Sequence, residues 1–323
     1  MRSRLLPAIP ALLLVACTAE PESDGDGQTG TDAGMTEADT GESGDGDGDG
    51  DGDGNGDGDG DGEDPTPQNL PTPTGACPTF ESGYVPFSPA SIDQRTVRLW
   101  VGEDPQPGGL LVIYWHAYTS GADEAAFTLS APVIEAITAA GGVVAAPFAA
   151  DDVGEFPWFV VNNSDRQDDM LLADEIVACA IEQVGVDPRR IHSSGMSAGG
   201  LQTTAFSMAR SHYIASSASF SGGTFMQLPF EDASNKFSAM IIHGGDNDIF
   251  GGAVNFKTLS TAWFNQLRDN GNFAFMCDHG GGHTIPSGYG SSVANFFFAH
   301  PFGTQPSPYA EALPAEFPTD CSL

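Results

Sequence analysis

The stretch R-I-H-S-S-G-M-S-A-G-G-L-Q, residues 190–202, decides the fold of this chain. Its beginning, residues 190–194, has the pattern of a short strand, and residues 197–210 have that of a helix. The pattern G-x-S-x-G, residues 195–199, stands where the two meet. A turn this sharp forces its central serine into a strained conformation and needs very small neighbours. The stretch therefore predicts that Ser197 is a nucleophile at the end of a strand.

Apolar runs alternate with amphipathic stretches on both sides of this junction. The further strands that we expect are residues 96–101, 110–115, 142–148, 216–220, 239–243 and 273–277, and the further helices are residues 123–140, 168–183 and 259–269. Strands that alternate with helices in this way are typical of a doubly wound, mostly parallel sheet. We therefore predict one α/β domain over residues 77–323.

Much of the acidic charge lies in front of this domain. Residues 18–76 carry 18 of the 44 acidic residues and no lysine or arginine, and residues 44–62 are a nearly pure Asp-Gly repeat. Such a segment has no apolar surface to bury and repels itself, so we expect residues 17–76 to form a disordered tether. A calcium loop is disfavoured there, because no glutamate closes the loop and no helices flank it.

The charge balance also excludes two classes of partner. The chain has 11 basic residues, no basic cluster and a formal net charge of −33. Nucleic acid is therefore not expected as a partner, and neither is an anionic lipid surface bound through basic side chains.

The first residues resemble the signal of a bacterial lipoprotein. Two arginines precede an apolar stretch, residues 5–16, that is too short to span a bilayer. It ends in L-V-A-C, which is similar to the lipobox, in which cleavage before the cysteine makes that residue the lipidated N-terminus. The resemblance implies a signal peptide over residues 1–16 and a membrane anchor at Cys17. It places the protein in the cell envelope, as an outer-membrane lipoprotein, or outside the cell.

A serine nucleophile needs two partners that the sequence supplies further along. A histidine must accept the hydroxyl proton, and a carboxylate must hold that histidine; in sheets of this kind they follow in the order serine, acid, histidine. The run H-G-G-D-N-D, residues 243–248, follows one expected strand, and D-H-G-G-G-H-T-I-P, residues 278–286, follows another. These runs leave Asp246 or Asp248 as the acid.

The second run likewise offers two histidines as the base, His279 and His283. A zinc site built on this pair is disfavoured, because it lacks carboxylate or thiolate companions. No metal and no cofactor are expected.

Several of these segments resemble the polyhydroxybutyrate depolymerase and feruloyl esterase group of α/β-hydrolases. V-D-P-R-R-I (186–191) followed by G-M-S-A-G-G (195–200) is similar to the family's D-P-x-R-(V/I)…G-x-S-A-G-G, and S-G-G (221–223), H-G-G (243–245) and G-H-T-I-P (282–286) also match family segments. The resemblance implies an α/β-hydrolase fold and a serine esterase, with Ser197 as nucleophile, Asp248 as acid and His283 as base. It favours Asp248 because the following Ile249-Phe250 resembles the apolar pair after the family acid, although the usual position of that acid holds Asn247.

The family has H-G after an early strand, whereas this chain reads His116-Ala117-Tyr118. Because the donors of an oxyanion hole are backbone groups, we expect the N–H groups of Tyr118 and Ala198 to bind the oxyanion. His116 and Trp158 are candidates for substrate binding. Trp158 belongs to F-P-W-F, residues 156–159, which we expect to form an exposed, stiff loop.

The expected function is the hydrolysis of an ester, possibly polymeric, through an acyl-enzyme. There are two kinds of candidate substrate. One is a polysaccharide that carries feruloyl or acetyl esters, and the other is polyhydroxyalkanoate. A non-catalytic surface adhesin with a hydrolase-like domain and a serine peptidase on the same fold are the alternatives.

The cysteines agree with export to an oxidising compartment. Apart from Cys17, the chain has Cys77, Cys179, Cys277 and Cys321, which allow three pairings. Cys77 and Cys321 bracket the domain, so one expectation is that they tie its ends together and that Cys179 and Cys277 pair or remain thiols.

Overall fold

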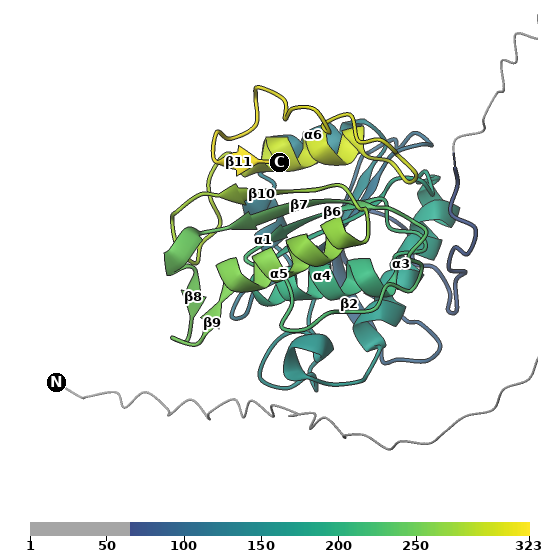
Figure 1. Ribbon diagram of the computed structural model, residues 1–323. Helices are drawn as coiled ribbons and strands as arrows, with labels where there is room; N and C mark the ends of the chain where they lie inside the picture. Colours follow the sequence, from purple (N-terminus) through teal and green to yellow (C-terminus); the bar gives the residue numbers. More distant parts are fainter. Residues whose placement is uncertain (1–64) are drawn as a thin grey trace, which may run out of the picture. The chain divides into compact units, whose positions relative to one another are not determined.

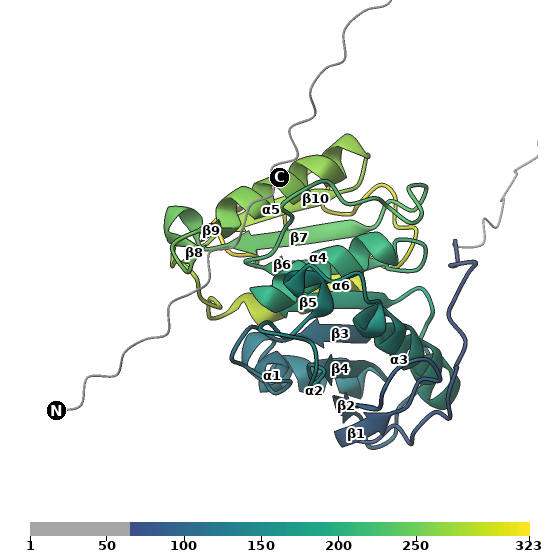
Figure 2. The same ribbon diagram turned by 90° about the horizontal axis from the view of Figure 1, so that it is seen from below.

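A computed structural model describes residues 65–323, in which a nine-stranded sheet carries helices on both faces (Figures 1 and 2). In chain order the strands of this sheet are β1 (Gly83–Phe87), β2 (Arg95–Val101), β3 (Leu111–Trp115), β4 (Val143–Pro147), β5 (Ile191–Met196), β6 (Ser216–Phe220), β7 (Ser238–His243), β10 (Ala274–Asp278) and β11 (Cys321–Ser322). Their spatial order is β1-β2-β4-β3-β5-β6-β7-β10-β11. The strands from β4 to β10 in this order are parallel, whereas β2 and β11 run antiparallel to their neighbours. The predicted α/β fold is confirmed.

Six α-helices of residues 65–323 form the outer layers. They are α1 (Glu124–Thr128), α2 (Ala131–Ala139), α3 (Asp168–Val184), α4 (Ala198–Ala209), α5 (Phe256–Asp269) and α6 (Tyr289–Ala299). Helices α3, α4 and α5 bury their apolar side chains in one core, and α1, α2 and α6 contribute to a second core on the opposite face. A small hairpin of β8 (Ile249–Phe250) and β9 (Val254–Asn255) projects beyond β7.

The central strands are buried on both faces, which explains their composition. Strands β3 and β4 read L-V-I-Y-W and V-V-A-A-P, and every residue in them is buried. Strand β5 carries polar side chains that satisfy one another: His192 Nδ1 lies 2.9 Å from Ser216 Oγ, and Trp115 Nε1 donates to Ser193 Oγ over 3.1 Å. The carboxyl ends of the parallel strands lie along one edge of the sheet. The loops that carry the predicted site residues emerge from this edge.

The structure differs from the predicted elements in three places. The expected helix over residues 123–140 is broken into α1 and α2, because Ser130 adopts a left-handed φ of 72° and a proline follows in the first turn of α2. Helix α6 was not predicted, since residues 289–299 show little helical periodicity. The edge strands β1 and β11 also escaped prediction, because short edge strands carry weak patterns.

The first described residues are packed against the domain. The backbone N–H groups of Thr74 and Gly75 donate to the carboxylate of Glu175 over 2.8 and 2.9 Å, and Leu70 contacts the core. Residues 65–76 therefore differ from the expected tether. The predicted signal peptide, Cys17 and the Asp-Gly repeat lie outside the described residues.

Both disulfides differ from the expected pairing. Cys77 is bonded to Cys179 of α3, and Cys277 of β10 is bonded to Cys321 of β11. The pairing of Cys77 with Cys321 is wrong because β1 and β11 lie at opposite edges of the sheet, so each end of the domain is tied to its own edge. Within residues 65–323, no helix has the length and apolar character needed to cross a membrane.

The packing of His300 yields a prediction for stability. This imidazole is buried among Phe273, Phe296 and Tyr309, with Nδ1 donating to Phe296 O over 2.8 Å. Burial lowers the pKa of His300 to about 4. As pH falls below about 6.5 the unfolded chain takes up this proton while the folded chain does not, so the free energy of unfolding decreases by roughly 2–3 kcal/mol between pH 7 and 4.5.

Urea unfolding at several pH values measures this contribution. The variant His300→Gln should lose less stability than the wild type over the same interval, whatever its stability at pH 7. Parallel pH dependences for the two proteins would contradict the assignment.

Candidate functional site

Ser197 stands on a sharp turn between β5 and α4. Its backbone has φ 58° and ψ −117°, a strained conformation for a residue with a side chain. A Cβ atom at Gly199 would lie 1.8 Å from Trp115 O, and one at Gly195 would lie 2.5 Å from the same atom. Only glycine fits at either position, which is why this turn needs the G-x-S-x-G sequence.

The three side chains predicted to act together lie in one hydrogen-bonded chain. The hydroxyl of Ser197 is 2.9 Å from His283 Nε2, and His283 Nδ1 is 2.7 Å from Asp248 Oδ1. Nδ1–H donates to the carboxylate, which leaves Nε2 to accept the hydroxyl proton. These residues follow β5, β7 and β10, whose carboxyl ends share one edge of the sheet.

The carboxylate of Asp248 is fully buried and fully hydrogen-bonded. Its second oxygen, Oδ2, accepts from the Ser221 hydroxyl and from Gly244 N–H, each over 2.8 Å. Burial by itself would raise the pKa of Asp248, but the hydrogen bonds from His283, Gly244 and Ser221 outweigh it, so the pKa lies below its usual value. The group is therefore held as an anion facing the imidazole.

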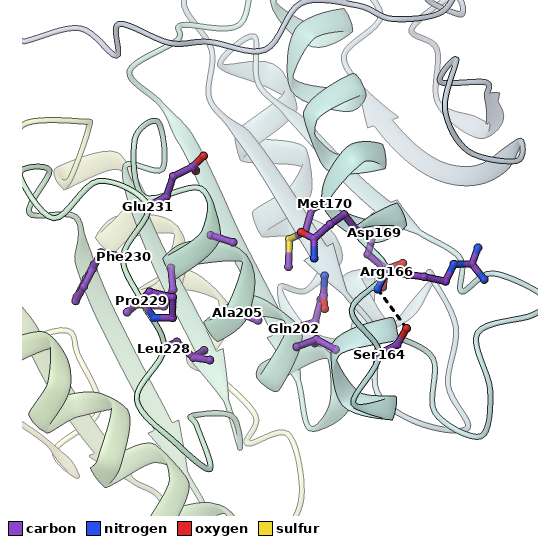
Figure 3. Close-up of a pocket in the computed structure, with 14 residues that line it drawn as sticks. Ser164, Arg166, Asp169, Met170, Gln202, Ala205, Leu228, Pro229, Phe230 and Glu231 are labelled. Atoms are coloured by element: carbon purple, nitrogen blue, oxygen red, sulfur yellow. Dashed lines mark hydrogen bonds between the residues drawn. The ribbon is translucent and has the colours of Figure 1, made fainter.

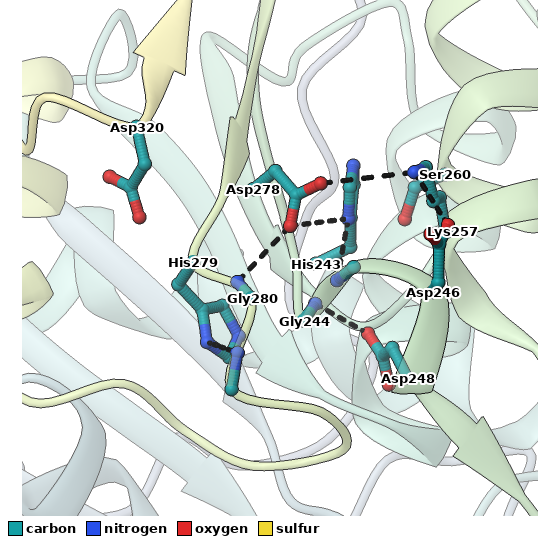
Figure 4. Close-up of polar contacts among 12 residues, drawn as sticks. His243, Gly244, Asp246, Asp248, Lys257, Ser260, Asp278, His279, Gly280 and Asp320 are labelled. Carbon is teal, nitrogen blue, oxygen red and sulfur yellow. Dashed lines mark hydrogen bonds and ion pairs between the residues drawn. The ribbon is translucent and has the colours of Figure 1, made fainter.

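Asp246, the alternative acid, occupies a different position. Its side chain is exposed and pairs with Lys257 Nζ over 2.7 Å (Figure 4). Asp246 and Asp248 are separated by one residue of the loop, yet the carboxylate of Asp248 is buried and bonded to the imidazole, whereas that of Asp246 lies in solvent.

His279 and His243 hold the loops around the acid. His279 Nδ1 accepts from Gly281 N–H over 3.2 Å, and His243 Nδ1 accepts from Gly245 N–H over 3.1 Å (Figure 4). Burial lowers the pKa of both imidazoles, which favours the neutral, accepting form. The imidazole that reaches Ser197 is that of His283.

Phe256 packs against one face of the His283 ring. The two rings are stacked, with centroids 4.6 Å apart and planes 12° from parallel. The N–H of Phe256 also donates to the backbone oxygen of Asp248 over 2.9 Å. Ser221 and Phe256 are thus positioning residues that sequence reasoning missed. The S-G-G segment marked the place of Ser221 but not its contact, and Phe256 had no local signal.

The turn after β3 is held by a half-buried glutamate. Glu124 Oε1 accepts from Ala117 N–H and from the Tyr114 hydroxyl, each over 3.0 Å. The next N–H along the chain belongs to Tyr118, and among residues 65–323 no group accepts a hydrogen bond from it. Ala198 is the first residue of α4, where the N–H groups have no partner within the helix and the helix dipole favours an anion.

The prediction that Trp158 lies on an exposed loop is wrong. Its side chain is completely buried, packs edge-on against Trp115 at 5.0 Å, and donates from Nε1 to His116 O over 2.9 Å. His116 is also buried, and its Nδ1–H donates to Ala117 O over 2.9 Å. Both side chains therefore support the turn that carries Tyr118, and neither offers its surface to a bound molecule.

Other residues line a cavity of about 350 Å³ (Figure 3). It is bordered by α3, α4 and the connection between β6 and β7, and it contains the buried amide of Gln202, whose two polar atoms lack partners. None of the three hydrogen-bonded residues lines it. Over the described part of the chain, no group of three or more potential metal ligands is present.

Comparison with known proteins gives structural likenesses only. No protein-family model and no curated protein matches the chain. A variant of pOPH solved in complex with DMSO is similar, with a TM-score of 0.60 and 16% identity over 79% of this chain and 95% of that one. A thermostable esterase has a TM-score of 0.50 and 16% identity over 68% and 63%, and esterase PE8 has 0.50 and 18% over 63% and 98%. At these identities the likenesses show the α/β-hydrolase fold.

The two candidate acids can be separated by amide substitution. Asp248→Asn removes the negative charge that faces His283 and favours the wrong imidazole tautomer, so we expect kcat for an activated ester to fall about 10³- to 10⁴-fold. Asp246→Asn should stay within about twofold of the wild type, because its partner is a surface lysine. Equal losses in the two variants would contradict the distinction.

Proposed function

We propose that this chain is a serine carboxylic-ester hydrolase that acts through an acyl-enzyme. The observation that carries the proposal is the continuous hydrogen-bonded chain from Ser197 through His283 to the buried anion of Asp248. A buried carboxylate behind an imidazole raises the ability of Nε2 to take a proton, which a serine hydroxyl needs before it can attack.

The reaction divides into two half-reactions of the same kind. His283 Nε2 accepts the Ser197 proton as Oγ attacks the ester carbonyl, and the resulting imidazolium, facing Asp248, returns the proton to the leaving alcohol oxygen. The C–O bond of the ester breaks and an acyl-serine remains. Water then attacks this acyl-serine with His283 again as base, and the acid departs as Ser197 regains its proton.

The N–H groups of Tyr118 and Ala198 are proposed to bind the oxyanion. Tyr118 N–H has no acceptor within the described residues, and Glu124 holds the preceding peptide in place. Donors that are fixed before the reaction stabilise developing charge without reorganising. His116 and Trp158 contribute by supporting this turn.

Two of the similar structures are described as esterases, and a variant of pOPH was solved with pNPB. Their fold carries many chemistries, so they support an ester substrate only together with the side chains found here.

Two exposed apolar side chains on the connection between β6 and β7 favour an apolar, polymeric ester. Phe225 and Met226 are 62% and 69% exposed, and they follow closely after Ser221, which contacts Asp248. Neighbouring apolar side chains at a surface commonly mark binding sites. Of the candidate substrates, polyhydroxyalkanoate fits this surface better than feruloyl or acetyl groups on a polysaccharide.

Export and lipid anchoring at Cys17 are part of the proposal. The two disulfides support an oxidising compartment, where such bonds persist. Metabolic labelling with a fatty acid, compared between the wild type and Cys17→Ser, tests the anchor.

Hydrolysis of p-nitrophenyl acetate tests the enzymatic proposal. Ser197→Ala should lower kcat at least about 10³-fold, because it removes the attacking oxygen. Ser207→Ala is a matched control in α4, the helix that follows Ser197, where the hydroxyl donates only to Thr203 O. Equal rates for the wild type and Ser197→Ala would refute the enzyme and favour a binding role.

The surface at Phe225 and Met226 gives a prediction about polymers. Replacing both with serine should lower the release of acid from polyhydroxybutyrate granules severalfold more than it lowers hydrolysis of p-nitrophenyl acetate, since only the polymer extends across the surface. Lys236→Ser, a change at a partly exposed position of the same connection, controls for altered folding. A proportional loss on both substrates would argue against a polymer-binding surface.

A further inference from the structure

We propose that Phe250, together with Tyr118, forms a subsite for the alcohol part of the ester, and that this alcohol is aromatic or otherwise apolar. The inference rests on the proposed ester hydrolysis and assigns a substrate class to the same site.

A continuous series of aromatic rings begins at the imidazole. The ring of Phe250 lies 6.0 Å from that of His283 and 6.1 Å from that of Tyr118, measured between centroids. Tyr118 in turn lies 5.1 Å from Phe156. The three aromatic residues are partly exposed and come from the loops after β3, β4 and β7. Aromatic rings prefer such tilted and edge-to-face arrangements, and a further ring can join them.

The sheet topology places these rings over the nucleophile. Tyr118 follows β3 and Phe250 follows β7, and in the sheet β5 and β6 lie between those two strands. Ser197 follows β5, so a contact between Tyr118 and Phe250 reaches across the part of the edge that carries the hydroxyl. Ser197 is itself only 6% exposed. The rings of Tyr118 and Phe250 therefore border the approach to Ser197.

The chemistry decides which part of the ester meets Phe250. The leaving oxygen must come within hydrogen-bonding distance of His283 Nε2 to receive its proton. One face of the imidazole is covered by Phe256, which is buried. The alcohol therefore reaches the imidazole from a side that Phe256 leaves open, and Phe250 borders that ring.

Two esters with a common acyl group isolate this subsite. Benzyl acetate and ethyl acetate give the same acetyl-enzyme, so the ratio of their kcat/KM values reports the alcohol alone. We expect Phe250→Ala to lower the benzyl-to-ethyl ratio about tenfold, and Phe250→Leu, which keeps apolar bulk, to lower it less. Ile249→Ala is the matched control, because the preceding residue of the same strand points to the opposite face and is 43% exposed.

A second pair of esters tests the acyl side. p-Nitrophenyl acetate and p-nitrophenyl butyrate share their leaving group, and Phe250→Ala should leave their kcat/KM ratio unchanged. A change in this ratio with none in the benzyl-to-ethyl ratio would place Phe250 on the acyl side and overturn the inference. An unchanged benzyl-to-ethyl ratio in a variant whose unfolding midpoint matches the wild type would overturn it too.

Failure of the proposed function gives a different result. If Ser197→Ala hydrolyses all four esters as fast as the wild type, the enzyme itself is refuted and the subsite with it. If the wild type is active and Ser197→Ala is not, while Phe250→Ala keeps the wild-type benzyl-to-ethyl ratio, only the subsite is refuted.

Discussion

The strained turn at Ser197 is the constraint on which the rest of the site depends. A serine with φ 58° at the end of β5 is kept in place because α4 closes tightly over the strand, with Gly199 against Trp115 O. The backbone of Ser197 is fixed further by its N–H, which donates to Phe220 O over 2.9 Å. Contacts with the sheet thus keep Ser197 in its strained backbone conformation, and its hydroxyl is fixed at the edge of the sheet.

The other two side chains reach that point because their loops leave parallel strands at the same edge. Of the two, Asp248 needs more support from its surroundings, because burying a carboxylate without hydrogen-bond partners costs much free energy. Three donors converge on it, from His283, Ser221 and Gly244, and they come from the loops after β10, β6 and β7. Asp248 therefore joins three loops, and its carboxylate orients the imidazole that faces Ser197.

The sequence predicted those parts of the molecule that local patterns specify. The central strands and the turn at Ser197 follow from apolar periodicity and small residues, and the fold class follows from their alternation with helices. Tertiary packing decided the rest. Trp158 was expected in solvent because of the neighbouring Pro157, yet it is buried against Trp115. The disulfides depended on which edge of the sheet each cysteine reaches, and no local pattern contains that information.

The connection between β6 and β7 shows how one fold acquires a particular surface. Each of the neighbouring parallel connections β3–β4, β5–β6 and β7–β10 contains a helix, whereas residues 221–237 form an irregular segment. Its first residue, Ser221, donates to Asp248, so one end of the segment is anchored at the site. No helix in this segment buries Phe225 and Met226, and both side chains are exposed. When exposed apolar side chains contact another apolar surface, they leave water, and this transfer lowers the free energy. The irregular connection therefore both places Ser221 against Asp248 and leaves Phe225 and Met226 at the surface.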